Sequence, residues 1–100
     1  MFTIEEKVEN GVITAYLKGE LDSVSVLGAE PILCNLVDKS SNIVLDCTDM
    51  EYIASSGLRV LLMLQKQVKS INGSLVLVHV HPDVMDTLKV TGFVRLLTIR

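Results

Sequence analysis

Two adjacent serines and a glycine open a strongly apolar helical pattern in the middle of the chain. Ser55, Ser56 and Gly57 follow Ala54 and lead directly into the run Leu58 to Leu64. Serine is a preferred helix-capping residue, because its oxygen accepts an amide proton that the first turn leaves unpaired. The amides and the positive macrodipole end of the same helix start favour an anion. The pattern therefore predicts either simple capping or a serine that carries a phosphate.

Other residues that could do chemistry give weaker signals. His79 and His81 are two positions apart on a predicted strand, but no third ligand stands at a suitable spacing, and structural zinc takes about four ligands. Cys34 in a helical pattern and Cys47 at the end of an apolar strand are expected to be reduced core thiols. The sequence has no Walker loop and no Gly-x-Ser-x-Gly elbow. We therefore expect no catalysis, no cofactor and no metal.

The composition predicts one globular domain with an aliphatic core. The 100 residues are 49% apolar and 21% charged, with few aromatics. Nine basic and twelve acidic residues give a net charge of −3, so no basic surface is expected for nucleic acid or anionic lipid. The longest apolar run, Val60 to Leu64, is far below the ~20 residues of a membrane-spanning helix, and no leader pattern opens the chain. We expect a single soluble, cytoplasmic domain of residues 1–100, monomeric when free.

The segments before the serines show strand and helix patterns in turn. Asn10-Gly11, the strongest short hairpin signal, separates Phe2 to Glu9 from Val12 to Leu17. Ile43 to Cys47 is short and evenly apolar, which predicts a central strand covered on both faces. Between these strands apolar residues recur at helical spacing. Pro31 is favoured only in the first turn of a helix, so the regular part of this helix is expected from near Glu30.

The helix after the serines has one apolar face and one polar stripe. The face expected to pack on the sheet consists of Gly57, Val60, Leu61, Leu64, Val68 and Ile71. The opposite side carries Arg59, Lys66 and Ser70. Leu62 and Met63 flank this polar stripe, so we expect them to be partly exposed on the same surface as Arg59, as a docking patch.

The rest of the chain predicts a mixed α/β fold. Asn72-Gly73 ends the helix, Ser74 to Val80 predicts a strand, a short helix begins at Pro82, and Leu96 to Ile99 predicts the last strand. Alternation of strands and helices after a hairpin implies right-handed βαβ crossovers and a mixed, mostly parallel sheet with helices packed against it. This topology is expected to bring five acidic residues to one edge: Glu20, Asp22, Asp46, Asp49 and Glu51.

Four motifs in order resemble the STAS family and, within it, the small bacterial anti-sigma factor antagonists. They are Gly-Glu-Leu-Asp at 19–22, Val44-Leu45-Asp46, Tyr52 to Leu58, and Leu88 to Phe93. The resemblance covers nearly the whole chain with matching spacings. It implies a regulatory protein without catalysis of its own. Such a protein docks on an anti-sigma factor that is also a serine kinase, and so frees a sigma factor.

The resemblance also implies which residues form the site. The family phosphoacceptor is the first serine of the Ser-Ser-Gly turn, which by position is Ser55, with Ser56 as the second choice. Phosphorylation in such proteins blocks docking, and a PP2C-type phosphatase restores it. For Asp22 the alternative to a partner role is a turn residue that caps the first helix. For Gly57 the alternative is a residue that permits close packing of the helix on the sheet. The expected partner-binding residues are Asp22, Ser23, Ser56, Gly57, Arg59, Leu62 and Met63.

The sequence departs from the family pattern in three places. Ala54 stands where phosphorylated members often have an acidic residue, which removes a possible kinase contact. The stretch Val24 to Pro31 is irregular where the family has a smoother helix start. The chain ends at Arg100, where relatives commonly add a helix, so the final family helix is expected to be absent or truncated.

Two other functions stay open at the level of sequence. One is a STAS module that acts as a structural or interaction subunit of a transport or sensory complex, in which the serines only cap a helix. The other is a small nucleotide-binding or phosphotransfer protein that uses the same helix start as an anion site.

Overall fold

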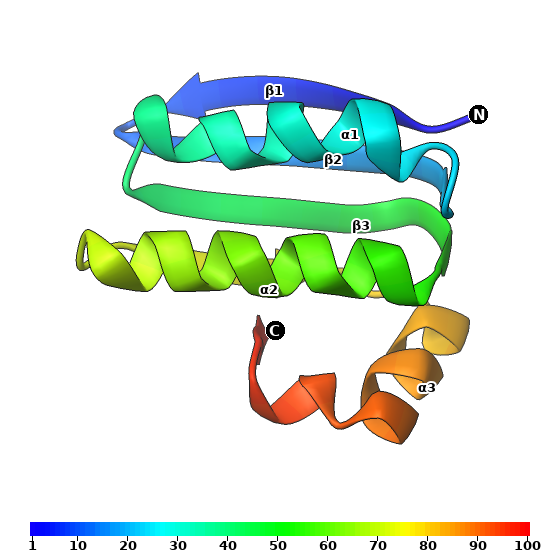
Figure 1. Cartoon of the computed structure of the whole chain (residues 1–100). Helices are drawn as coiled ribbons and strands as arrows, with labels where there is room; N and C mark the ends of the chain where they lie inside the picture. The colour runs from blue at the N-terminus through cyan, green and yellow to red at the C-terminus, as the bar shows by residue number, and fades with distance from the viewer.

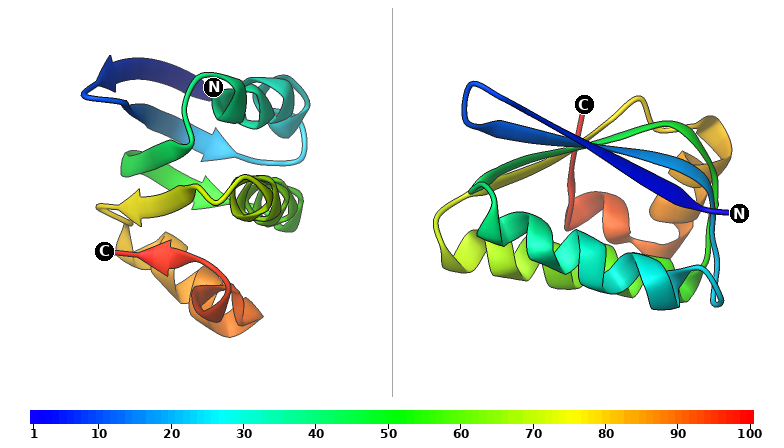
Figure 2. Two further views of the ribbon diagram at one scale, coloured as in Figure 1. Left: turned by 90° about the vertical axis from the view of Figure 1, so that its left-hand side faces the viewer. Right: turned by 90° about the horizontal axis from the view of Figure 1, so that it is seen from above.

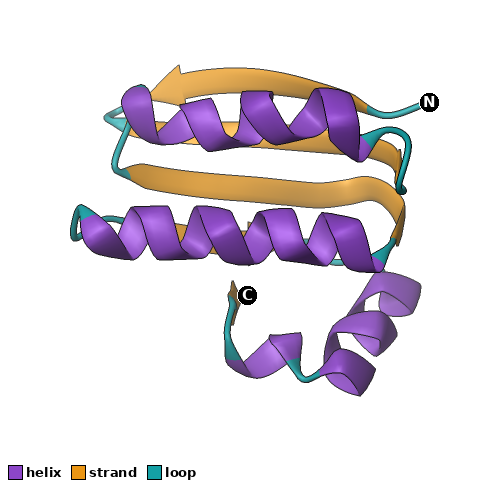
Figure 3. Cartoon of the chain, viewed as in Figure 1, coloured by secondary structure: helices purple, strands orange, loops and turns teal.

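An antiparallel hairpin opens the fold, and strand–helix units follow it (Figures 1 and 3). The computed structural model describes residues 1–100. In chain order its elements are β1 Thr3–Glu9, β2 Val12–Leu21, α1 Val26–Cys34, the 3₁₀ turn η1 Asn35–Asp38, β3 Asn42–Ile53, α2 Ser55–Ser70, β4 Ser74–Val78, α3 Pro82–Thr91, the 3₁₀ turn η2 Phe93–Arg95 and β5 Thr98–Ile99. None of these helices is long and apolar enough to cross a membrane.

The strands form one sheet in the order β1-β2-β3-β4-β5. The β1–β2 pair is antiparallel, and every later pair is parallel. Because β2, β3 and β4 run in the same direction, their carboxyl ends meet at one edge, where α1, α2 and α3 begin (Figure 1). The mixed, mostly parallel α/β sheet predicted from the sequence is confirmed.

Helices α1 and α2 lie side by side over one face of the sheet (Figure 2). The core between these layers is a cluster of 23 buried apolar residues, and no polar or charged residue is buried. Its large side chains are almost all Leu and Ile, as the composition predicted, because the strands alternate inward aliphatic residues with outward polar ones. The core therefore contributes no titratable carboxylate or amine, and the charged chemistry of the protein lies on its surface.

The hairpin turn is the one predicted. Asn10 and Gly11 have φ angles of 52° and 79°, the left-handed values that a two-residue type I′ turn requires at both positions. Glu9 then pairs with Val12, and the register continues without interruption to the Thr3–Lys18 pair.

Helix α1 begins four residues before the predicted start near Glu30. Pro31 lies inside this helix rather than in its first turn. The helix tolerates Pro31 because this residue is exposed and its missing N–H leaves only the carbonyl of Leu27, also exposed, without a helical partner. The irregular stretch predicted from Val24 to Pro31 is thus mostly regular helix.

Strand β3 is longer than predicted and is covered on one face only. It continues past Cys47 to Ile53, because β2 stays paired with it as far as the Leu21–Ile53 pair. The inward residues are buried, but Asp46 on the outward face is half-buried and Thr48 is exposed. The prediction of cover on both faces was wrong, since α1 and α2 pack on the same side of the sheet.

The C-terminal elements are shorter than predicted. Strand β4 ends at Val78, and His79 leaves it with a left-handed φ of 56°, so His79 and His81 do not share a strand face. The 3₁₀ turn η2 leaves only Thr98–Ile99 for the last strand. Ile71, predicted on the packed face of α2, follows the end of the helix and is 46% exposed.

Candidate functional site

The first turn of α2 lies at the carboxyl edge of the sheet, but neither serine caps it. Ala54 is the N-cap residue, with extended backbone at φ −89° and ψ 169°, and no side chain completes the cap. Ser55 and Ser56 are already helical, so their hydroxyls are past the position from which a cap can accept the first amide protons. The prediction of simple capping by a serine was therefore wrong.

The two serine hydroxyls lie in different environments. Ser55 is exposed, whereas the Oγ of Ser56 is buried and has no hydrogen-bond partner. Successive helical residues are about 100° apart around the axis, so an outward Ser55 places Ser56 toward the protein. Only the Ser55 hydroxyl is open to an incoming enzyme, and Ser56, the second choice from the sequence, is not.

Gly57 holds this helix start close to the sheet. It is buried, and a Cβ at this position would lie 2.9 Å from Cγ1 of Ile53 and 2.9 Å from Cγ of Leu21. The amide of Ala54 also donates to the carbonyl of Leu21 at 2.9 Å. The structure thus supports the packing interpretation of Gly57, which acts through the position of Ser55 rather than through an exposed surface.

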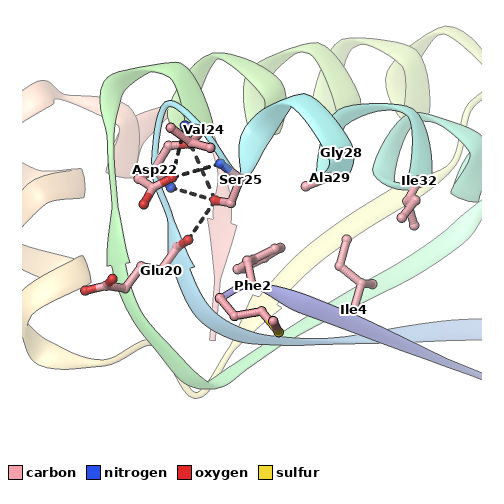
Figure 4. A pocket seen from close by; sticks show the side chains of 10 residues that line it. Phe2, Ile4, Glu20, Asp22, Val24, Ser25, Gly28, Ala29 and Ile32 are labelled. Carbon is pink, nitrogen blue, oxygen red and sulfur yellow. Dashed lines mark hydrogen bonds between the residues drawn. The ribbon is translucent and has the colours of Figure 1, made fainter.

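The turn between β2 and α1 is built by Asp22 and Ser25. Oδ1 of Asp22 accepts the amides of Ser25 at 2.8 Å and Val24 at 3.0 Å. In return, Oγ of Ser25 accepts the amide of Asp22 at 2.9 Å and donates to the carbonyl of Glu20 at 2.7 Å (Figure 4). This reciprocal pair is a capping box, in which each side chain satisfies the backbone of the other residue.

The capping box fixes the charge of Asp22. The amides of Ser25 and then Val24 lower the pKa of the Asp22 carboxyl, because both bonds favour its ionised form. The structure supports a turn role for Asp22 before α1: its carbonyl accepts the amide of Val26, the first helical residue, although the N-cap residue of α1 is Ser25, which has no side-chain cap bond. Ser25 was missed by sequence reasoning, although the Asp-x-x-Ser spacing before an apolar run was a usable signal for a capping box.

An exposed strip on α2 continues from Ser55 along the helix. Arg59 is exposed, Met63 is 38% exposed and Leu62 is half-buried, as predicted. These residues stand four, eight and seven positions after Ser55, spacings that keep them on one side of a helix. Ser23, in the neighbouring β2–α1 turn, is also exposed.

The acidic edge is smaller than predicted. Glu20, Asp22 and Glu51 lie near the carboxyl ends of β2 and β3. Asp46 and Asp49 lie further back along the sheet, paired with Tyr16 and Lys18, because β3 continues well beyond them.

Both cysteines are free thiols. Burial, with a smaller contribution from Asp46, raises the pKa of Cys47 to about 12. Burial also raises the pKa of Cys34, followed by the nearby charge of Glu30. Both shifts favour the protonated thiol. Cys47 lies in the core as predicted, whereas Cys34 is half-buried and is not part of the core cluster, so the prediction of a core position was wrong for Cys34.

Comparison with known proteins assigns the family. The STAS domain model matches residues 3–100, and the chain belongs to the STAS domain family. A relative in Bordetella bronchiseptica, named as the anti-sigma factor antagonist BtrV, is 34% identical over 91 residues, which cover 90% of this chain and 78% of the relative.

Solved structures share the fold. An anti-sigma factor antagonist from Mycobacterium paratuberculosis superposes with a TM-score of 0.88 at 21% identity, over 99% of this chain and 85% of that one. The phosphorylated form of SpoIIAA, a cell fate determinant of Bacillus, gives a TM-score of 0.72 at 18% identity, over 100% of this chain and 91% of that one.

The close contact at Gly57 predicts a difference between two glycine substitutions. Gly57→Ala is expected to lower the free energy of unfolding by about 1–3 kcal/mol, because the new methyl group overlaps Leu21 and Ile53. Gly28→Ala in α1 is the matched control, since its Cβ would meet nothing within 4 Å, and it is expected to raise that free energy by about 0.4–1 kcal/mol. Urea unfolding measures both. Equal stability of the two variants would contradict the contact.

The lowered pKa of Asp22 predicts a pH dependence of stability. A depressed carboxyl pKa stabilises the fold above the unfolded value of about 3.9 and loses this effect as the pH falls through the folded value. Asp22→Asn keeps an acceptor oxygen without the charge. We expect the native protein to have the higher urea midpoint at about pH 6 and the two midpoints to converge below about pH 4. A gap that is constant with pH would show that ionisation of Asp22 contributes nothing.

Proposed function

We propose that this chain is an anti-sigma factor antagonist that binds an anti-sigma factor and releases a sigma factor, and that phosphorylation of Ser55 switches this binding off. The exposed hydroxyl of Ser55, at the first helical residue of α2 and in line with the Arg59–Met63 strip, is the observation that carries the proposal. Its support includes the antagonist named as a relative and the phosphorylated form known for SpoIIAA.

The start of α2 can hold a phosphate without loss of the fold. Leu58 is the first residue of the helix whose amide donates to a carbonyl at the helix start, that of Ala54. The amides of the residues before Leu58 and the positive end of the helix dipole therefore favour an anion at this position. Ser55 is exposed, so esterification of its oxygen displaces no core atom.

The same phosphate changes the surface that a partner meets. It adds about −1.5 to −2 charges at neutral pH beside an edge that already carries Glu20, Asp22 and Glu51. Carboxylates of a docked partner would be repelled, and close packing on the first turn of α2 would require removal of water from a dianion. Phosphorylation therefore weakens docking while the scaffold stays folded.

The proposal defines a set of partners. The anti-sigma factor is a serine kinase that modifies Ser55, and a PP2C-type phosphatase removes the phosphate, both in the cytoplasm. The docking residues are Asp22 and Ser23 of the β2–α1 turn and Arg59, Leu62 and Met63 of α2, with the chain monomeric when free. The kinase must select Ser55 without an acidic residue before it, since that position is Ala54.

The two other functions considered from the sequence have less support. The structural-subunit alternative assumed serines that only cap α2, but Ala54 occupies the N-cap. The nucleotide-binding alternative needs a pocket at the same helix start, and none of the grooves in the structure is lined by Ser55 or Ser56.

The proposal is tested with the serine-kinase anti-sigma factor of the source organism, by calorimetry and by mass spectrometry after incubation with ATP. We expect unmodified protein to bind and Ser55-phosphorylated protein to bind at least about tenfold more weakly, which is about 1.4 kcal/mol. Ser55→Ala should bind and take up no phosphate. Ser56→Ala is the matched control, which should be phosphorylated like the native chain because the Ser56 hydroxyl is buried.

Three results would contradict the proposal. A phosphate found on Ser56 or on neither serine would remove the assigned site. Equal affinity of the modified and unmodified forms would remove the switch. Failure of the unmodified chain to form a complex would remove the function itself.

A further inference from the structure

Arg59 is a cation without an acidic partner in the structure. It is exposed on α2, four residues after Ser55, and it takes part in none of the ion pairs of the chain. Helix α2 contains no acidic residue. The one charged residue of the neighbouring helix α1, Glu30, is half-buried and forms no ion pair with Arg59. The guanidinium of Arg59 is therefore free beside the proposed phosphorylation site.

Helix geometry directs the side chain of Arg59 back toward Ser55. Residues four positions apart on a helix have their Cβ atoms about 5–6 Å from each other. Each Cα–Cβ bond tilts toward the N-terminus of the helix, and a long side chain lies over the turn before its own residue. The turn before Arg59 is the one that begins with Ser55. The guanidinium is thus within reach of a group attached to the Ser55 oxygen.

The other near neighbours of Arg59 on α2 cannot pair with it. Three and four positions away along the helix, they are Ser56, Leu62 and Met63. The Ser56 oxygen is buried, and the side chains of Leu62 and Met63 are apolar. A phosphate on Ser55 would be the first negative charge on this helix.

No other basic residue of α2 competes with Arg59 for that phosphate. Lys66 stands eleven residues after Ser55, which is about 16 Å along the helix axis, and Lys69 is farther still. This distance exceeds the screening length of about 8 Å at physiological ionic strength. Along α2, Arg59 is the one cation whose attraction for a phosphate at Ser55 is not screened.

We propose that the phosphate on Ser55 binds the guanidinium of Arg59 in the same helix, and that this ion pair withdraws Arg59 from the docking surface. In the unmodified chain, Arg59 pairs with a carboxylate of the anti-sigma factor. After phosphorylation, its planar guanidinium makes charge-assisted hydrogen bonds to the phosphate oxygens instead. This inference rests on the proposed function, because it concerns the phosphate at the same site.

The ion pair gives the switch two electrostatic parts. Phosphorylation adds about −1.5 to −2 charges and at the same time occupies the positive charge nearest to Ser55 on α2. A partner carboxylate at this surface thus loses an attractive group and meets a repulsive one. The anion also precedes the cation along the helix, which is the order that the helix dipole favours. The pair therefore stabilises the start of α2 while it weakens docking.

The ion pair is tested on the full chain with phosphoserine incorporated at position 55 during translation, which requires no kinase. Phosphorus NMR follows the pH at which the phosphate loses its second proton. We expect this pH to be lower in the otherwise native chain than in Arg59→Gln, because the guanidinium favours the dianion. Lys66→Gln, the matched control, removes the same charge from an exposed position two turns beyond Arg59 and should leave this pH unchanged. The other titratable groups of the carboxyl edge are the same in all three proteins: Glu20, Asp22, Glu51, His81 and Asp83.

A second measurement reports contact rather than charge. In nitrogen-15 spectra, the Nε–H proton of Arg59 should exchange with water at least about threefold more slowly in the chain with phosphoserine at position 55 than in the unmodified chain. An Arg59 signal that does not respond to the phosphate, or a phosphate that titrates alike in the otherwise native chain and in Arg59→Gln, would overturn the proposal.

The complex tests whether Arg59 belongs to the docking surface from which the phosphate withdraws it. We expect unmodified Arg59→Gln to bind the anti-sigma factor at least about tenfold more weakly than the native chain, since buried arginines are frequent hot spots of interfaces. Lys66→Gln should bind as the native chain does. Both residues are exposed, so neither substitution disturbs the core. Native affinity of Arg59→Gln would show that the phosphate has no docking contact to remove at Arg59, and the proposal would be wrong.

The outcomes separate this inference from the proposed function. If phosphoserine at position 55 does not respond to Arg59 while phosphorylation still abolishes binding, the ion pair is wrong and the function stands. If the unmodified chain forms no complex, the function is wrong, and the regulatory role of the pair is wrong with it, even where the spectra show the contact.

Discussion

The contact of Gly57 with Leu21 and Ile53 sets the geometry on which the rest of the site depends. It brings the first turn of α2 against the ends of β2 and β3, so close that a Cβ at position 57 would require the side chains of Leu21 and Ile53 to shift. The hydrogen bond from Ala54 to Leu21 fixes the residue before the helix at the same point. Because the helix is fixed in rotation as well as position, Ser55 faces solvent and Ser56 faces the protein.

This arrangement separates the proposed phosphorylation site from the residues that stabilise the fold. The core is wholly apolar, and the charged groups of the carboxyl edge lie outside it, near the ends of β2 and β3 and in the β2–α1 turn. A change of charge at Ser55, as the proposed function requires, would therefore act on the surface and leave the layers beneath in place. The capping box of Asp22 and Ser25 adds a second fixed turn beside the first, so that the edge presents a preformed surface to a partner. Preformed surfaces lose less entropy on binding than flexible ones.

Much of the fold followed from local patterns. Asn10-Gly11 specified the hairpin because few residues tolerate two successive left-handed positions. The spacing of Val60, Leu61, Leu64 and Val68 specified the buried face of α2, and with it the exposure of Arg59 and Met63. These predictions succeeded because the residues involved carry their own conformational or burial preference.

The errors arose where contacts between distant segments override local preference. The cap of α2 is Ala54 because its amide is held by Leu21, thirty-three residues earlier in the chain, against the local preference for serine. Strand β3 extends to Ile53 because β2 pairs with it, although the polar pair Thr48-Asp49 interrupts the apolar run that predicted the strand. The start of α1 follows the turn built by Asp22 and Ser25; a capping role for Asp22 was considered from the sequence, but its partner Ser25 was not recognised.

The central claim is that Ser55 is an exposed switch on a scaffold that does not respond to its modification. Amide NMR spectra of the free chain before and after phosphorylation of Ser55 test this claim most directly. We predict shifts confined to the first turn of α2 and the neighbouring β2–α1 turn, with the sheet and the rest of the helices unchanged. Shifts spread through β2, β3 and the core would show that the phosphate acts by rearranging the fold, and would contradict the account.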